Sequence, residues 1–114
     1  MPESNFPFGD IFLQSYTKEL NYSQFPYKDD FSTVKNVTPS FPRTYITDGD
    51  ADWLMGQARE MTQALEDNKV NVTSYFPVNK GLGHDYQLDL LSEEGQKVLN
   101  DILLFMKECT LKNQ

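Results

Sequence analysis

The stretch "RTYITDGDADWL", from Arg43 to Leu54, joins a strand-forming run to a cluster of acidic residues. The run "RTYIT" is rich in β-branched and aromatic side chains, a composition that favours a β-strand. Asp48, Asp50 and Asp52 follow it at alternate positions. The sequence therefore predicts a short strand that leads directly into three closely spaced carboxylates.

The residues after this stretch alternate between helical and extended patterns. Apolar side chains recur at helical spacing from Leu54 to Leu65, and this helix is expected to end at Asn68, a residue type that tolerates a left-handed turn. Val70–Phe76 alternates in the manner of a second strand. Ser92 can cap a last helix with a broad apolar face, formed by Val98, Leu99, Ile102, Leu103, Phe105 and Met106.

The expected order is strand, helix, strand, loop, helix, which predicts an α/β fold with two parallel strands joined by a crossover helix. In such units, ligands and catalytic groups gather beyond the carboxyl ends of the strands. The acidic stretch follows the first strand, and "GLGHD" (residues 81–85) follows the second. His84, the only histidine of the chain, should therefore lie at the same edge as the aspartates.

A calcium-binding loop is an alternative explanation of the alternating aspartates. An EF-hand begins with Asp-x-Asp-x-Asp but needs glycine at its sixth position and glutamate at its twelfth. Counted from Asp48, these positions hold Trp53 and Arg59. The tryptophan cannot easily make the required turn and the arginine repels the ion, so the sequence does not predict an EF-hand.

Composition limits the classes of function. The chain has 114 residues, with 24% charged and 39% hydrophobic side chains, which suits one domain with a modest core. Its net charge of −7 disfavours nucleic acid and anionic membrane surfaces as partners. We find no apolar run of bilayer length and no signal-peptide pattern, and we expect a cytoplasmic protein. Cys109 is the only cysteine, which excludes an internal disulfide.

The chain divides near Pro42. Residues 1–41 are rich in aromatic side chains and contain a four-residue apolar repeat that predicts a short helix starting near Asp10. Residues 21–40 lack a clear period and are expected to form an ordered loop region. Residues 42–114 carry the regular strand and helix patterns.

From Ser40 to Met106, the sequence resembles the C-terminal part of an α/β-hydrolase, more closely an esterase or lipase of the hormone-sensitive-lipase-like branch. The matching residues are "SFPRTYITDGDADWL" and "KVNVTSYFPVNKGLGHDY". In that family, a strand leads into Gly-x-x-Asp, and the loop after the final strand carries the catalytic histidine. Residues 49–52 fit Gly-x-x-Asp, so the resemblance implies that Asp52 is the acid and His84 the base of a Ser-His-Asp triad.

The resemblance also suggests roles for the other residues at this edge. Asp50 is the alternative triad acid, whereas Asp48 fits strand-end solvation or a turn acceptor. Asp52 also fits a helix N-cap, and Asp85 is expected to face solvent. Residues 1–41 would correspond to part of the cap that covers the substrate in this family.

The nucleophile expected of this family is missing from the sequence. None of the serines lies in Gly-x-Ser-x-Gly, and no His-Gly-Gly-Gly-like stretch supplies an oxyanion hole. We therefore expect a hydrolase fragment that is inactive alone, needs no cofactor and acts on a small ester only when completed. Two parallel strands form a poor sheet, so the chain is expected to form a homo-oligomer or to pair with an N-terminal half. The alternative is a non-catalytic α/β module that serves interaction or self-assembly.

Overall fold

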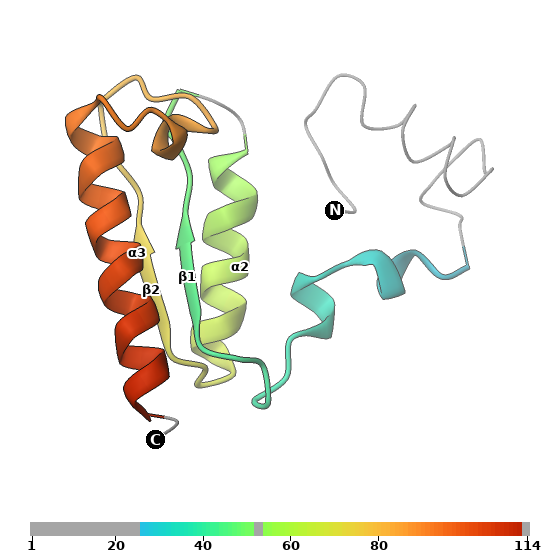
Figure 1. The fold of residues 1–114 in the computed structure, drawn as a ribbon. Helices are drawn as coiled ribbons and strands as arrows, with labels where there is room; N and C mark the ends of the chain where they lie inside the picture. Colours follow the sequence, from blue (N-terminus) through green and yellow to red (C-terminus); the bar gives the residue numbers. More distant parts are fainter. Residues whose placement is uncertain (1–25, 52–53, 113–114) are drawn as a thin grey trace.

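The computed structural model describes residues 26–51 and 54–112 (Figure 1). Two strands alternate with two long helices: β1 (Thr44–Thr47), α2 (Met55–Asp67), β2 (Val72–Tyr75) and α3 (Glu93–Lys112). Short 3-10 helices lie at Lys28–Phe31, Val34–Asn36 and Tyr86–Leu88. The predicted order of strand, helix, strand, loop and helix is confirmed.

The strands form a parallel pair whose register runs from Thr44 opposite Val72 to Thr47 opposite Tyr75. Because β1 and β2 point the same way, the loops that follow them emerge at one edge of the sheet (Figure 1). Among the described residues, these are the two strands of the sheet. The predicted α/β mixture with parallel strands is confirmed, and each strand has an outer edge that no described strand pairs.

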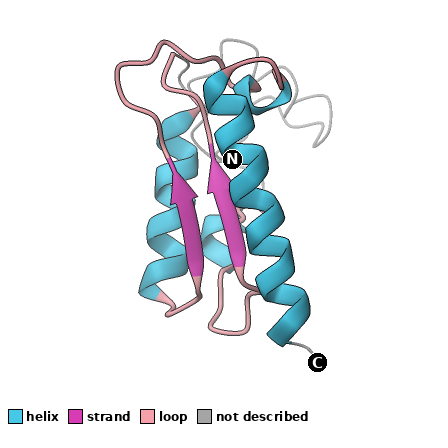
Figure 2. Ribbon diagram, turned by 60° about the vertical axis from the view of Figure 1, so that its left-hand side comes forward, coloured by secondary structure: helices cyan, strands magenta, loops and turns pink. Residues whose placement is uncertain are grey.

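The two helices cover opposite faces of this sheet. On one face, the ring of Tyr45 meets that of Phe105 from α3 edge-on, with centroids 5.9 Å apart. On the other, the guanidinium carbon of Arg59 from α2 lies 4.8 Å from the ring centroid of Phe76. Figure 2 shows the strands between the two helices. Both faces carry side chains because successive residues of an extended strand point to opposite sides of the sheet.

The fully buried apolar core is small. Leu65 of α2 and Val98 of α3 are both 0% exposed, and Val70 and Tyr86 are also buried. Large apolar side chains of α3, in contrast, remain exposed in the described part of the chain: Leu99, Leu103, Leu104, Met106 and Leu111. The apolar stripe of α3 is therefore wider than the two strands cover.

The start of α3 agrees with the sequence prediction, and the end of α2 differs from it. The Oγ of Ser92 accepts a hydrogen bond from the Gly95 N–H at 2.9 Å, which confirms the predicted cap of α3. The left-handed turn after α2 was expected at Asn68, but Asn68 has φ −90° and Lys69 has φ 59°. The asparagine instead donates its side-chain N–H to the Ala64 carbonyl at 2.8 Å.

Within the described residues, neither long helix is apolar enough over a sufficient length to cross a bilayer.

Candidate functional site

Two loops meet in backbone contact at the carboxyl edge of the sheet. The Ala51 N–H, in the loop after β1, donates to the Leu82 carbonyl, in the loop after β2, at 2.8 Å. A Cβ atom on Gly49 would lie 2.1 Å from the Gly83 carbonyl oxygen and 2.2 Å from that of Leu82. Only glycine allows this approach, so Gly49 sets the distance between the loops.

Asp50 fastens the second loop to the first. Its Oδ2 accepts a hydrogen bond from the Lys80 N–H at 2.7 Å, and its Oδ1 accepts one from the Leu82 N–H at 2.8 Å. The bonds from Leu82 and then Lys80 lower the pKa of the Asp50 carboxyl below its ordinary value of 3.8, because they favour the ionised form. Both oxygens of this carboxylate thus hold the loop.

The imidazole of His84 lies against a buried carboxylate. Its Nδ1 is 3.0 Å from Oδ1 of Asp48. Asp48 is only 5% exposed, and the same oxygen accepts a hydrogen bond from the Gly49 N–H at 2.8 Å. Asp48 directly follows β1, so the end of the strand fixes the position of this carboxylate. A buried carboxylate on Nδ1 is the arrangement that orients a histidine and fixes its tautomer.

A second carboxylate lies near the other nitrogen of the imidazole. The side chain of His84 is 53% exposed, and its Nε2 lies 3.6 Å from Oδ1 of Asp85, whose side chain is 67% exposed. The expectation that Asp85 faces solvent is thus met by its exposure. The ring therefore has a buried carboxylate at Nδ1 and an exposed carboxylate near Nε2, and about half of the side chain is exposed.

Tyr86 anchors the chain immediately after His84. The hydroxyl of Thr47 donates to the Tyr75 carbonyl at 2.7 Å, so in its 2.5 Å contact with the Tyr86 hydroxyl it accepts and the tyrosine donates. Burial is the main cause that raises the pKa of Tyr86, which keeps this donor protonated. One tyrosine, two residues after His84, is thereby tied to the ends of both strands.

The aspartates predicted from the sequence have different outcomes. Asp52 lies outside the described residues, so its role as triad acid stays a prediction. The N-cap position of α2 is Leu54, which makes no side-chain capping bond. Asp48 accepts a turn hydrogen bond as expected, but it is buried rather than solvated and lies next to His84. Its position immediately after the strand was the sequence signal that could have identified it.

Comparison with known proteins gives no assignment, since no family model, curated protein or solved structure matches the chain. Within residues 26–51 and 54–112, no three histidine, cysteine or acidic side chains are grouped so that they could hold a metal ion.

We predict that Gly49→Ala separates the two loops, because its Cβ would overlap backbone atoms. We expect a loss of about 1–3 kcal/mol in the free energy of unfolding, the usual cost of overpacking, together with a change in the His84 ring signals in NMR spectra. Gly56→Ala in α2 is the matched control. Its Cβ would meet no atom within 4 Å, and alanine should stabilise the helix by up to about 1 kcal/mol. Equal effects of the two substitutions would contradict the role of Gly49.

We also predict that acid loosens the loop after β2. The pKa of Asp50 is depressed in the folded protein, so its contribution is present above the unfolded pKa and is lost as the pH falls through the folded value. Hydrogen exchange, corrected for intrinsic rates, should show that the Lys80 and Leu82 amides lose protection on acidification below about pH 4. In Asp50→Asn they should be less protected already at neutral pH. If the protection of these amides changed neither with acidification nor in Asp50→Asn, Asp50 would not be what holds the loop.

Proposed function

We propose that the chain is the acid–base portion of a carboxylic-ester hydrolase of the esterase or lipase type. The observation that supports it is the 3.0 Å approach of a buried carboxylate, Asp48, to Nδ1 of a half-exposed histidine, His84. The location of the pair beyond parallel strands is the usual place for catalytic groups in α/β proteins. The sequence resemblance to α/β-hydrolases, which places a catalytic histidine at this loop, is independent support.

The chemistry follows from the two nitrogens of the ring. A carboxylate that accepts the Nδ1 proton leaves the lone pair on Nε2, which can take the proton of a serine hydroxyl as its oxygen attacks the ester carbonyl. The same nitrogen then returns the proton to the leaving alcohol, and a water molecule repeats the sequence on the acyl-enzyme. The resemblance assigns the acid to Asp52, whereas the contact within the described residues favours Asp48.

The serine has to come from outside this sequence. No serine has the flanking glycines of a nucleophile turn, and Ser32 is 1% exposed. We propose that a second half-domain supplies the serine and the oxyanion donors. The outer edge of β1, which no strand within residues 26–51 and 54–112 pairs, offers it backbone partners, and the exposed side chains of Leu99, Leu103 and Met106 on α3 offer apolar surface. No cofactor is needed, since this chemistry uses side chains and water.

A non-catalytic module is the second candidate, and the position of Asp85 favours it. When His84 is protonated, both of its nitrogens lie near carboxylates, with Asp48 at 3.0 Å and Asp85 at 3.6 Å. Such a ring can hold two segments together without doing chemistry. In that case, removal of the imidazole costs stability and has no consequence for ester hydrolysis in any complex.

We predict that the purified chain does not hydrolyse p-nitrophenyl acetate or butyrate faster than an equal concentration of free imidazole, because the nucleophile and oxyanion donors are missing. His84→Ala should leave this background unchanged. Turnover above free imidazole that His84→Ala abolishes would contradict the need for a second half. Once a serine-bearing half is mixed in, activity that requires His84 would support the hydrolase, and activity indifferent to His84→Ala would leave only the non-catalytic candidate.

A further inference from the structure

The outer edge of β2 has backbone groups available for another strand. In the parallel ladder, the Thr44 N–H donates to the Asn71 carbonyl at 3.1 Å, and the register then assigns residues 71, 73 and 75 to the bonds with β1. The N–H and C=O groups of Val72 and Ser74 consequently point away from β1, toward the outer edge. No strand in the described part of the chain pairs with this edge.

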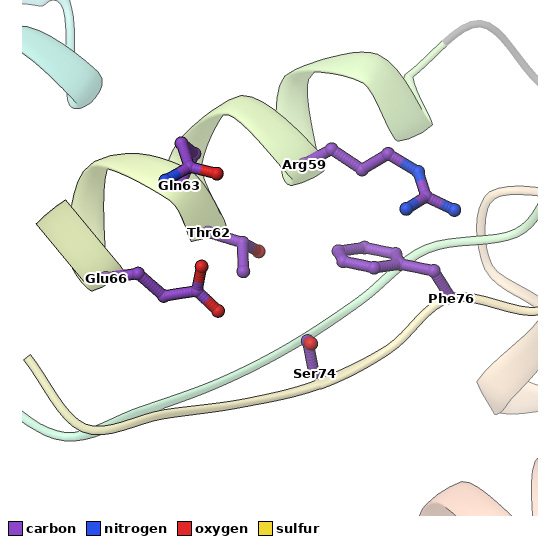
Figure 3. A pocket seen from close by; sticks show the side chains of 6 residues that line it. All are labelled: Arg59, Thr62, Gln63, Glu66, Ser74 and Phe76. Atoms are coloured by element: carbon purple, nitrogen blue, oxygen red, sulfur yellow. The ribbon is translucent and has the colours of Figure 1, made fainter.

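A pocket of about 280 Å³ lies between this edge and α2. Figure 3 shows its lining, with four side chains from the helix and two from the strand segment: Arg59, Thr62, Gln63, Glu66, Ser74 and Phe76. The Arg59 guanidinium lies over the Phe76 ring at one end, and Glu66 occupies the other end (Figure 3). A cation and an anion thus lie at the two ends of the pocket, with the exposed Ser74 between them.

This arrangement is complementary to itself under a two-fold rotation. The helix α2 runs opposite to β2 (Figure 1), so Arg59 lies toward the carboxyl end of the strand and Glu66 toward its amino end. A two-fold axis perpendicular to the sheet, midway between Ser74 and its counterpart in a second copy, pairs two β2 edges in the antiparallel direction. The same rotation brings Arg59 opposite Glu66 of the second copy, and Glu66 opposite Arg59 of that copy.

We propose that a second copy of this chain occupies the outer edge of β2 and forms a symmetric dimer with a continuous four-stranded sheet. Outward peptide groups of Ser74 bond to those of the other Ser74, and Val72 faces Phe76 across the junction. Two arginine–glutamate pairs flank the axis and select the antiparallel register. The dimer does not depend on the proposed hydrolase function, because the β1 edge and the His84 loop remain outside it.

Charge reversal tests the dimer by sedimentation velocity, with circular dichroism to verify folding. The unmodified chain should dimerise. Arg59→Glu places two glutamates opposite each other, and Glu66→Arg does the same with arginines, so each should raise the dissociation constant on the order of tenfold or more. The double variant should restore the dimer. A mixture of the two single variants should form a heterodimer, since each then meets its complement. Lys107→Glu on α3, with the same charge change as Arg59→Glu, should leave association unchanged.

A second variant tests the backbone pairing rather than the charges. Ser74→Pro removes an outward N–H, which an edge strand tolerates, and leaves the ladder with β1 intact; it should abolish the dimer. A wild-type chain that stays monomeric at high concentration would overturn the proposal. A dimer that persists in both single charge variants, or a double variant and mixture that stay monomeric, would also overturn it. Binding of unrelated extended peptides at this edge, without self-association, would show that the occupant is a different polypeptide.

Discussion

The parallel pairing of β1 with β2 is the constraint on which the rest of the structure depends. It brings residues 48–51 and 80–85 to one edge, where their backbones bond directly through Ala51 and Leu82. The side chains of Asp48 and His84, which are 36 positions apart in sequence, can then meet. An antiparallel hairpin of the same segments would place these loops at opposite ends of the strands.

Gly49, Asp50 and Tyr86 stabilise the contact between the two loops in different ways. Gly49 permits the backbone contact because it has no Cβ, and Asp50 ties the second loop through two backbone N–H groups. Tyr86, two residues after His84, is joined to the ends of both strands through Thr47. The loop that carries His84 is therefore held at Lys80, Leu82 and Tyr86, although half of the histidine side chain is exposed.

The sequence predicted the elements and the edge of the sheet well, because strand alternation, helical spacing and the Ser92 cap are local signals. It did not predict that Asp48 lies next to His84, and its assignment of Asp52 as the acid stays a prediction. Three aspartates at alternate positions are equivalent by composition, and the burial of Asp48 depends on the approach of two loops that are distant in sequence. The left-handed residue after α2 was misplaced by one position, because the Asn68 side chain bonds back to the helix and Lys69 makes the turn. The sequence alone also could not show that Arg59 and Glu66 lie beside the outer edge of β2, because their position there depends on the packing of α2 on the sheet.

Two strand edges that no described strand pairs give the molecule two distinct surfaces. The outer edge of β1 and the exposed leucines of α3 suit a large apolar partner, such as the second half-domain proposed above. The edge of β2 lies beside a polar pocket with a charge at each end, and suits a second copy. The site at His84 lies at the carboxyl ends of the strands, separate from the outer edges of β1 and β2.

The tautomer of His84 tests the central contact most directly, and ¹⁵N NMR of the labelled protein reports which ring nitrogen carries the proton. We expect the neutral imidazole to carry the proton on Nδ1, held by Asp48, and Asp48→Ala to shift it toward the Nε2–H form. Asp85→Ala should leave it on Nδ1. A neutral ring protonated on Nε2 in the unmodified protein, or a tautomer that responds to Asp52→Ala but not to Asp48→Ala, would contradict the assignment of Asp48 as the orienting carboxylate.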